Sequence, residues 1–592
     1  MALPPGALYL APRVPQLLAP PAAVYATSYV ARTHFSVPTP TWVLAIAYVL
    51  CYPLALAAYI QWRDFTIARD AAAAGAVMPP VVEAKWIGGL DLMRRAGSDF
   101  DQHILGYRLA QLAERYGYTF DFRALFRPRY STSEPEYIKR ILATDFQSYE
   151  KGPEFRFQMK DLLGTGVFAA DGKLWKFHRG MTRPFFSRDR ISHFDVFDRH
   201  AEAALNLMKA RIAEGFPIDW QDLVSRFTLD SATEFLFGQD VRSLSAGLPY
   251  PPHTPLAARD AGAAAHPANR FAHAFLDAQL NSARRSRFTN AWPLTEFWRS
   301  RVDPSVQVME EFIQPLLREA LARKAQSPET KAEEAVEEGE TLLEHLVKLT
   351  DDPQIIRDET LNILLAGRDT TAITLTMAGY MLAEHPDMHH RLREEILAKV
   401  GTNRPTYDDI RDLKYLRAFI NEVLRMYPPV PFNVRFSTRS TVWPALSPGG
   451  QPIYVPPNTR CLYSVFIMHR RKDLWGPDAD KFDPDRFLDE RVTKYLTPNP
   501  FIFLPFNAGP RICLGQQFAY NEVSFMLIRL LQQVTAVRLR QEVDPANVPP
   551  PGYAVSPVTD GTDKVLIKSH LTMFVQGGLW VTMHEENVEG TN

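Results

Sequence analysis

Cysteine is scarce in this chain, whose 592 residues include only Cys51, Cys461 and Cys513. Three cysteines are too few for a disulfide framework, and none forms a Cys-x-x-Cys pair or lies near a histidine at zinc-site spacing. The composition therefore excludes a small disulfide-stabilised scaffold and a zinc module. We expect that a cysteine with a chemical role in this protein acts alone.

The chain also lacks an excess of charge of either sign. Its 66 Lys and Arg residues balance 67 Asp and Glu residues, which gives a net charge of −1. This balance offers no electrostatic basis for binding a polyanion, so we expect no nucleic-acid partner. Because 46% of the residues are hydrophobic and 11% aromatic, the chain can bury a large core.

One segment, residues 35–62, lacks charged side chains altogether. Within it, residues 41–60 supply the run of about 20 apolar residues that a membrane-spanning helix needs. A cleaved signal peptide would start earlier and end at a small-x-small site, and a buried core helix is the other alternative. We predict a single-pass membrane anchor at 41–62. Arg63 and Arg69 follow it and favour a cytosolic location for the bulk of the chain.

The anchor divides the chain into four predicted parts: an N-terminal tail (1–40), the anchor (41–62), a linker (63–95) and one large domain (96–592). The patterns of this domain are mainly α-helical with short strand-like stretches, and its longest apolar run, 355–384, predicts a helix about 45 Å long through the interior. Further amphipathic helices are predicted at 413–426 and 515–533, and exposed segments at 244–268 and 326–340.

Residues 506–515, Phe-Asn-Ala-Gly-Pro-Arg-Ile-Cys-Leu-Gly, indicate chemistry most directly. Gly509 and Gly515 permit tight turns and a close approach of the backbone to another group. Cys513 lies just before a predicted helix, where the helix dipole and free N–H groups favour the thiolate over the thiol. Such a sulfur can be a nucleophile or a metal ligand, although a lone cysteine is more often part of a core.

This segment resembles the haem-binding loop of the cytochrome P450 family, Phe-x-x-Gly-x-Arg-x-Cys-x-Gly, at every specified position. The resemblance implies a haem b cofactor with Cys513 as the axial thiolate ligand of the iron, Arg511 facing a propionate and Phe506 packed beside the cysteine. Such a thiolate pushes electron density onto iron and favours O–O cleavage in bound dioxygen. The implied fold is the mainly helical cytochrome P450 fold, a single large catalytic domain with an N-terminal transmembrane helix.

Other family motifs follow in the family's order. Glu422 and Arg425 match Glu-x-x-Arg, and Arg486 lies in a Pro-Asp-Arg-Phe segment. The resemblance implies that these three side chains form a buried structural network beside the haem. Because Glu-x-x-Arg is a common pattern, we expect its other copy, Glu296 and Arg299, to be an ordinary pair on a helix surface.

The predicted long helix carries Ala-Gly-Arg-Asp-Thr-Thr at 366–371, which resembles the family's oxygen-activation motif. Gly367 within a helix costs about 1 kcal/mol relative to alanine. Close approach of the haem would explain this glycine, and close helix packing is the alternative. Thr370 can donate to the carbonyl of Ala366 and open the helix locally. The resemblance makes Thr370 and Asp369 the pair that relays protons to dioxygen.

Trp175 and Arg179 match the family's Trp-x-x-x-Arg and lie on one helix face. The resemblance implies that both contact a haem propionate, as does Arg435, whereas His178 faces away and is expected to be a surface or neighbouring group rather than a ligand. The stretch is basic, with Lys173, Lys176, Arg179, Arg183, Arg188 and Arg190. In the family this helix borders the surface where the reductase docks, so we expect it to attract an acidic partner.

The resemblance implies a monooxygenase that inserts one atom of O₂ into a substrate C–H bond. NADPH electrons come from a separate cytochrome P450 reductase, with cytochrome b5 as an optional second donor. The chain has no Gly-x-Gly-x-x-Gly unit, so we expect no fused reductase. The implied location is the endoplasmic reticulum membrane, with lipid around the anchor and the catalytic domain in the cytosol.

Residues 506–529 and the helix motif look most like membrane-bound fungal hydroxylases of n-alkanes and long-chain fatty acids, whose product is usually the terminal alcohol. Family position predicts the pocket residues Leu365, Ala366, Val430, Pro431, Phe432 and Asn433. Broad-specificity oxidation of aromatic hydrocarbons or other xenobiotics is an alternative. Rearrangement of an oxygenated lipid without O₂ is another, although an intact Asp369–Thr370 pair argues against it.

Overall fold

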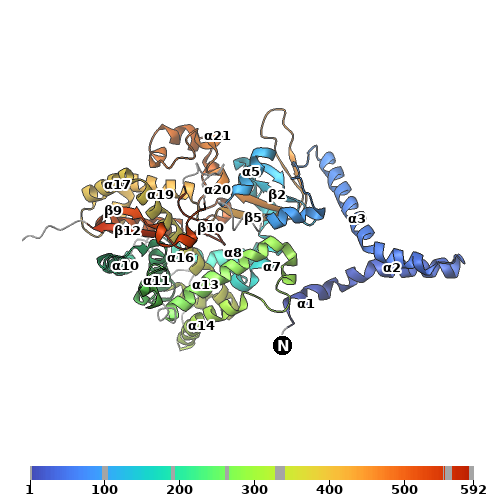
Figure 1. The fold of residues 1–592 in the computed structure, drawn as a ribbon, viewed down its shortest axis with the longest axis horizontal. Helices are drawn as coiled ribbons and strands as arrows, with labels where there is room; N and C mark the ends of the chain where they lie inside the picture. Colours follow the sequence, from blue (N-terminus) through green and yellow to red (C-terminus); the bar gives the residue numbers. More distant parts are fainter. Residues whose placement is uncertain are drawn as a thin grey trace, which may run out of the picture.

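The structure, a computed structural model, describes residues 3–95, 105–187, 194–259, 266–326, 340–550, 553 and 563–585. These residues are mainly helical and include four small sheets (Figure 1). This composition confirms the prediction of a mainly α protein with a small β region. The helices gather in one body, from which an N-terminal arm projects (Figure 1).

The central helix, α16 (Pro353–Glu384), is buried over most of its length. The Asp352 side chain caps it by accepting from the amides of Gln354 and Ile355. Next to it lies α11 (Trp220–Phe237), whose Trp220 indole donates to the carbonyl of Leu375 at 2.9 Å. The predicted interior helix at 355–384 is therefore confirmed, with two more residues at its start.

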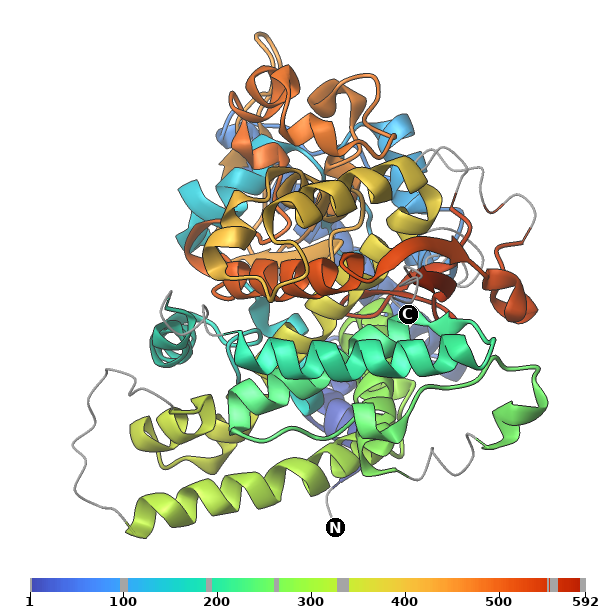
Figure 2. The ribbon, with the colours of Figure 1, turned by 90° about the vertical axis from the view of Figure 1, so that its left-hand side faces the viewer.

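Two further helices complete the centre, α19 (Lys414–Met426) and α22 (Gln516–Leu531), close to the ranges expected from the sequence. α22 lies beside α10 (Asp195–Ala213), and both helices run across the view in Figure 2. Phe197 of α10 and Phe518 of α22 meet edge to face, with ring centres 5.3 Å apart. These aromatic contacts fix the start of α22 and hence the loop that precedes it.

The largest sheet forms one wall of the domain, with the strand order β1-β2-β8-β5-β3. Its strands are β1 (Thr119–Asp121), β2 (Arg129–Thr132), β3 (Tyr149–Glu150), β5 (Phe432–Ser437) and β8 (Arg460–Ser464). In the antiparallel β5–β8 pair, Arg435 lies opposite Cys461 and Phe436 opposite Arg460. Because side chains alternate along a strand, Arg435 and Arg460 point to opposite faces of the sheet.

The remaining helices of the domain are α5 (Tyr107–Tyr116), α6 (Pro135–Lys139), α7 (Gly152–Leu163), α8 (Gly172–Thr182), α13 (Pro267–Arg285), α14 (Asp303–Gln326), α15 (Leu342–Leu349), α17 (Pro386–Lys399), α18 (Tyr407–Asp412), α20 (Val465–Met468) and α21 (Lys472–Trp475). The remaining strands are β4 (Ile218–Asp219), β6 (Thr441–Trp443), β7 (Ile453–Val455), β9 (Val534–Leu539), β10 (Ile567–Ser569), β11 (Met573–Val575) and β12 (Trp580–Glu585).

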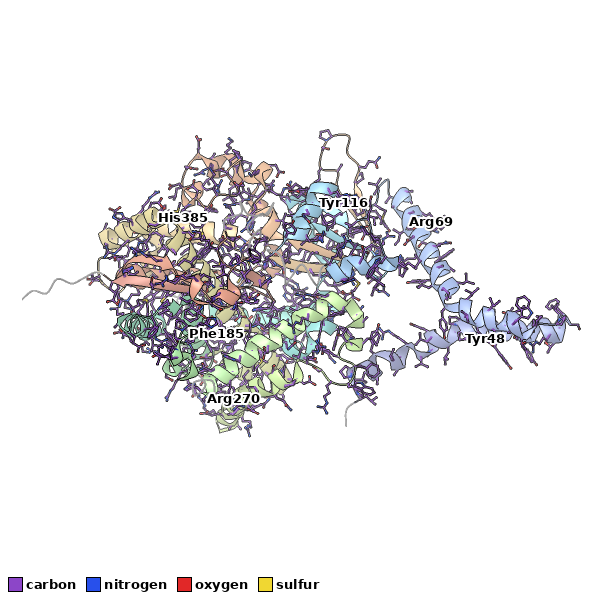
Figure 3. The ribbon with its side chains drawn as sticks, viewed as in Figure 1. Tyr48, Arg69, Tyr116, Phe185, Arg270 and His385 are labelled. Carbon is purple, nitrogen blue, oxygen red and sulfur yellow. The ribbon has the colours of Figure 1, made fainter. Side chains whose placement is uncertain are left out.

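The N-terminal arm consists of α1 (Pro5–Leu10), α2 (Val14–His34) and α3 (Thr41–Ala73). Within the part of the chain that the structure describes, α3 alone is long and apolar enough to cross a membrane, with a mean hydropathy of 2.1 over its most apolar window. It continues past residue 62, so the start of the expected linker is helical. Tyr48 and Arg69 lie in the arm, away from Phe185 inside the domain (Figure 3).

Both ends of the arm contact the domain. The amide of Gly6 donates to the carbonyl of Phe297 at 2.9 Å, and the amide of Val77 donates to the carbonyl of Pro452 at 2.9 Å. A helix that crosses a bilayer once separates its ends by about 30 Å of hydrocarbon. α3, with 33 residues, is long enough for such a crossing, and the crossing expected for 41–62 stays a prediction.

Two expectations about exposed segments are corrected by the structure. Within 244–268, Leu244 and Leu248 are buried in the core beside α10 and α11, while 260–265 lie outside the described residues. Within 326–340, residues 327–339 lie outside them, and Glu340 is buried and pairs with Lys348 at 3.0 Å. The composition of the first segment, rich in Ala, Pro and Gly, and that of the second, rich in Glu, did not reveal these buried side chains.

The second Glu-x-x-Arg copy is not the ordinary surface pair that its pattern predicted. Glu296 is 6% exposed and accepts two hydrogen bonds from Arg285, at 3.1 and 2.8 Å. Arg285 is itself buried, so its charge needs a carboxylate partner inside the protein. Glu296 is therefore half of a buried ion pair that joins α13 to the segment after it.

Candidate active site

A cavity of about 570 Å³ lies between α16, α8, the β5–β8 wall and the loop before α22. Of the predicted site residues, Trp175, Arg179, Leu365, Ala366, Gly367, Thr370, Val430, Phe432, Asn433, Arg435, Phe506, Arg511, Cys513 and Gly515 line it. Pro431, Asp369 and Gly509 are not among the lining residues. The cavity thus brings together side chains from segments more than 300 positions apart in the sequence, such as Trp175 and Cys513.

Cys513 differs from the other two cysteines in its surroundings. Cys51 and Cys461 are buried, whereas Cys513 is exposed on the cavity. Its amide donates to the carbonyl of Phe506 at 3.0 Å, which folds the loop back under the sulfur. Gly509, at a φ of 68°, allows this turn, because a Cβ there would lie 1.8 Å from the carbonyl oxygen of Leu142.

The sulfur has an unfavourable electrostatic setting as a free thiolate. Burial raises the pKa of the Cys513 thiol, although the Gly515 amide and Arg179 act in the opposite direction. Burial therefore opposes the stabilisation of the thiolate that the position before a helix was expected to provide. A metal cation bound to the sulfur supplies the missing stabilisation, because a coordinating thiol is deprotonated.

Positive charge gathers at one corner of the cavity, where Lys151, Arg435 and Arg511 converge. Burial and Arg435 lower the pKa of Arg511 to about 10, and burial with Arg435 and Arg511 lowers that of Lys151 well below its ordinary value. Asp171 is the carboxylate that offsets this charge, accepting from Arg511 at 2.7 Å. Three cations beside one carboxylate make this corner suited to a further anionic group.

Trp175 and Arg179 join α8 to the same corner. The Arg511 guanidinium lies 4.6 Å from the centre of the Trp175 ring system, and Arg179 donates to the carbonyl of Ile512 at 2.7 Å. The Arg179 hydrogen bond ties α8 to the residue directly before Cys513. The loop that holds the sulfur is therefore fixed from two sides, by α8 and by the start of α22.

α16 borders the cavity at the segment that the sequence analysis singled out. Thr370 donates to the carbonyl of Ala366 at 2.7 Å, as predicted. A Cβ at Gly367 would meet only the Cβ of Ala232, at 3.7 Å, which is an ordinary contact. Packing between helices therefore does not require glycine at this position. Gly367 instead faces the cavity, so a bulky group within the cavity explains why a side chain is absent here.

Asp369 is buried beside the cavity rather than on it. Its Oδ1 accepts from Arg368 at 2.7 Å, and its buried Oδ2 has no hydrogen-bond partner among the described residues. His570, on the turn between β10 and β11, lines the cavity near this pair. Burial lowers the pKa of His570 to about 4, with Asp369 acting in the opposite direction. His570 was not predictable as a site residue, because it lies about 200 residues along the chain from its neighbour on α16.

A set of hydrogen bonds missed by the sequence analysis holds the cavity wall at 164–168. The backbone amides of Thr165, Val167 and Phe168 donate to side-chain oxygens of Asp358, Glu359 and Asn362, at 2.7, 2.9 and 3.1 Å respectively. Val167 and Phe168 line the cavity. We call this set of six residues the α16 clasp. Its sequence signal was present as three polar residues inside an apolar helix, which a buried helix does not otherwise need.

His178 is fully buried, which corrects the expectation that allowed it a surface position. Its Nδ1 lies 2.8 Å from Oε2 of Glu359, the same oxygen that accepts from Val167. His178 therefore links α8 to the α16 clasp. Glu359 of α16 therefore contacts both the backbone of the 164–168 segment and His178, which lies about 180 positions away in the sequence.

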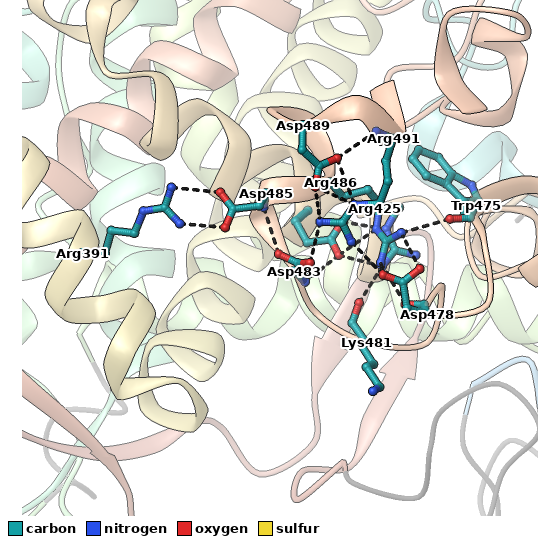
Figure 4. A network of polar contacts seen from close by, with 11 residues as sticks. Arg391, Arg425, Trp475, Asp478, Lys481, Asp483, Asp485, Arg486, Asp489 and Arg491 are labelled. Atoms are coloured by element: carbon teal, nitrogen blue, oxygen red, sulfur yellow. Dashed lines mark hydrogen bonds and ion pairs between the residues drawn. The ribbon is translucent and has the colours of Figure 1, made fainter. Parts of the chain in front are cut away.

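Glu422, Arg425 and Arg486 lie together in the interior, outside the cavity lining. Figure 4 shows Arg425 and Arg486 next to each other. Arg425 donates to Glu422 at 2.6 and 2.7 Å, and Arg486 Nε lies 3.6 Å from the same carboxylate. Arg425 also donates to the carbonyls of His469 and Ala479, both at 2.7 Å. These contacts tie α19 to the segment that leads toward the cysteine loop.

A cytochrome P450 family profile matches residues 79–558 of the chain. This chain belongs to the cytochrome P450 family. It is 36% identical over 487 residues to the cytochrome P450 monooxygenase pvhE of Talaromyces variabilis, covering 79% of this chain and 82% of that protein. It is 38% identical over 473 residues to cytochrome P450 52A12 of Debaryomyces hansenii, covering 77% and 86%. Cytochrome P450 52-E3 of Starmerella bombicola is 35% identical over 480 residues, covering 78% and 86%.

The protein is accordingly a cytochrome P450 monooxygenase, and the family implies a haem-thiolate cofactor, a redox partner and a small-molecule substrate. The cavity fits a haem in three respects. Cys513 offers a sulfur that needs a cation, Gly367 leaves room on α16, and the corner at Arg511 needs an anion such as a propionate.

Proposed function

We propose that this P450 hydroxylates long-chain apolar substrates, an n-alkane or a fatty acid, at or near the terminal carbon. The observation that carries the proposal is the placement of Cys513 and Thr370 on one cavity whose other walls are largely apolar. Phe155, Val167, Phe168, Ala366 and Leu571 are among the apolar side chains that line it. An apolar cavity favours hydrocarbon over polar substrates. The resemblance to the fungal alkane and fatty-acid hydroxylases points the same way.

Haem b would be held by Cys513 through its sulfur, with its propionates toward Arg511, Arg435 and Trp175. When bound, the haem supplies the activation of dioxygen, of which one atom enters the C–H bond and the other leaves as water with two electrons and two protons. Arg179 fixes the cysteine loop through the carbonyl of Ile512. These assignments follow from the cation-rich corner and the exposed sulfur.

Thr370 and Asp369 would deliver the protons. The Thr370 hydroxyl donates to the carbonyl of Ala366, which keeps its oxygen on the cavity side of α16. Asp369, one residue earlier, is buried and holds one carboxylate oxygen without a partner. Arg368 binds the other carboxylate oxygen of Asp369 at 2.7 Å. Once the Asp369 side chain rotates away from Arg368, its carboxyl group can pass a proton to the Thr370 hydroxyl.

The arm would hold the protein at the membrane of the endoplasmic reticulum, with the domain on the cytosolic side. α3 exposes most of its apolar side chains, which lipid would cover. Electrons would come from NADPH through cytochrome P450 reductase, with cytochrome b5 as an optional donor. The exposed Lys173 and Lys176 lie on α8, which is hydrogen-bonded to the cysteine loop, and would attract the reductase.

The first test is the carbon monoxide difference spectrum of the reduced protein. A Soret band typical of thiolate ligation is expected in the wild type and its loss in Cys513→Ser, while a band typical of histidine ligation in the wild type would contradict the assignment.

The second test is oxygen uptake with reductase and NADPH in the presence of dodecane or lauric acid. Product formed without added reductant would favour the rearrangement of an oxygenated lipid. Bound haem with no turnover of any substrate would favour a haem-binding sensor that catalyses no reaction.

A further inference from the structure

Arg460 is a cation on the cavity wall with no role in the proposed haem site or proton delivery. It opens strand β8 and lines the cavity together with Phe155 and Gln158 of α7. Its side chain is 20% exposed, and its one ion pair among the described residues is a long one, 3.9 Å from Nε to Oε1 of Glu154. No hydrogen bond of its guanidinium is found in the part of the chain that the structure describes.

Glu154 cannot satisfy Arg460, because another arginine already occupies it. Arg129 donates to both oxygens of Glu154, at 3.1 and 3.0 Å, in the bidentate geometry that a guanidinium and a carboxylate prefer. Arg129 and Glu154 are also both buried. Two arginines therefore share one carboxylate, which leaves this end of the cavity with a net positive charge. Burial and Arg129 lower the pKa of Arg460 to about 10, so Arg460 remains cationic at neutral pH.

Arg460 is separate from the cations that suit the haem propionates. It lies opposite Phe436 in the β5–β8 pair, whereas Arg435 lies opposite Cys461, so the two arginines point to opposite faces of the sheet. The groups that act on Arg460 are Arg129, Glu154 and Cys461. Those that act on Lys151 are Arg435, Arg511 and Asp171. The cavity thus has two cationic regions, on different faces of one sheet.

We propose that Arg460 binds the carboxylate of a long-chain fatty acid whose hydrocarbon chain extends through the cavity toward Thr370 and the haem that Cys513 would hold. This inference rests on the proposed function and narrows it, since an n-alkane has no group for Arg460 to bind. A carboxylate satisfies the guanidinium through two parallel hydrogen bonds and balances the excess charge. With the acid end held at the α7–β8 wall, the opposite end of the chain is the end that lies beside Thr370 and the haem. Arg460 therefore also favours oxidation at the terminal carbon.

The test begins with the wild-type holoenzyme and three ligands of equal chain length: dodecanoate, methyl dodecanoate and dodecane. Equilibrium binding is measured from the substrate-induced shift of the Soret band. Dodecanoate is expected to bind about 10- to 100-fold more tightly than its methyl ester, the range that a hydrogen-bonded charge provides. Equal affinity for acid and ester in the wild type would overturn the inference, even if Arg460 variants failed to fold.

The second arm uses Arg460→Gln, Arg460→Lys and a control, Arg270→Gln, on the exposed surface of α13. Arg460→Gln should weaken dodecanoate about 10- to 100-fold, leave dodecane unchanged and spread oxidation away from the terminal carbon. Arg460→Lys should keep part of the affinity, because it keeps the charge without the planar fork. The control should match the wild type. Unchanged dodecanoate affinity in Arg460→Gln would overturn the inference.

The two proposals fail in different ways. If the wild type shows the thiolate spectrum yet neither binds nor oxidises any of the three ligands, the proposed function is wrong, and this inference is wrong with it. If the wild type oxidises dodecane and dodecanoate but Arg460→Gln discriminates between them as the wild type does, the proposed function stands and the role of Arg460 is refuted.

Discussion

At the scale of single residues, the decisive differences lie in what surrounds a side chain rather than in its type. Cys461 and Cys513 are the same residue, but Cys461 is sealed within the strand pair while Cys513 opens onto the cavity. The same holds for the arginines of the site. Arg425 donates to a carboxylate and to backbone carbonyls, whereas Arg460 has one distant partner. Surroundings of this kind decide which groups remain free to meet a ligand.

Thr370 offers a prediction with a matched control on the same helix. Thr370→Val should leave the carbon monoxide spectrum unchanged but lower the product formed per NADPH by roughly tenfold or more, because the hydroxyl that we propose to pass protons is gone. Thr376 makes the same 2.7 Å bond to the carbonyl four residues earlier but does not line the cavity. Thr376→Val should therefore keep the wild-type ratio. A similar loss in both variants would indicate a structural effect on α16.

The network around Glu422 predicts a loss of stability. Glu422→Gln leaves Arg425 and Arg486 buried without their carboxylate, at a cost of about 3–5 kcal/mol. A lower midpoint of thermal unfolding and a smaller fraction of protein with bound haem should be measured. Asp485→Asn is the control, because Asp485 pairs with Arg391 at the surface, where both are about half exposed. An equal shift in the two variants would contradict the importance of burial.

At the scale of secondary-structure elements, the α16 clasp turns a helix into a support for a loop. Gly166 lies against Asn362, and a Cβ there would be 2.4 Å from Nδ2 of that residue. Gly166→Ala should therefore displace the segment that carries Val167 and Phe168 and alter the ratio of products, with less effect on the thiolate spectrum. Product profiles by gas chromatography measure this ratio.

The control for Gly166→Ala is Gly180→Ala. Gly180 lies in α8 with nothing within 4 Å of its Cβ position, so an alanine there should be tolerated. A product ratio that stays unchanged in Gly166→Ala would show that the clasp does not govern the cavity wall. A changed ratio in Gly180→Ala would show that the measurement responds to any substitution near α8.

Elements with a strong local pattern were predictable from the sequence, and contacts between distant segments were not. The helix at 355–384 follows from a long, mainly apolar helical pattern that ends before Pro386, and the Cys513 loop from its fixed spacing of glycines and arginine. The partner of Arg129 and the isolation of Arg460 depend on how α7 meets β8, which no local pattern encodes. Buried segments such as Leu244 were missed because their composition is that of a loop.

At the scale of the whole molecule, α8 connects the outer surface to the cavity. Lys173, Lys176 and Arg183 are exposed on or just after α8, while Arg188 and Arg190 of the predicted basic stretch lie outside the described residues. Since Arg179 of the same helix holds the residue before Cys513, a reductase bound there would lie close to the sulfur. The near-zero net charge of the chain conceals this local positive surface.

This surface predicts how the protein depends on its electron donor. The double variant Lys173→Glu, Lys176→Glu should raise the reductase concentration needed for half-maximal turnover several-fold and reduce its sensitivity to salt. Arg270→Glu, Arg284→Glu reverses the same number of charges on α13 and should behave as wild type. Steady-state rates over a reductase series at two ionic strengths measure the effect. Unaltered reductase and salt dependence in the α8 variant would refute this docking surface.

The attachment of the arm at Gly6 and at Val77 has a mechanical consequence. A domain attached to the arm at one point could rotate about that point in any direction. Two separate attachments define an axis, and only rotation about this axis remains. Here the fold itself supplies both points, one beside Phe297 and the other beside Pro452. If lipid surrounds the apolar arm, these two attachments limit the domain to rotation about the axis that joins them and so restrict which sides of the molecule can face the lipid.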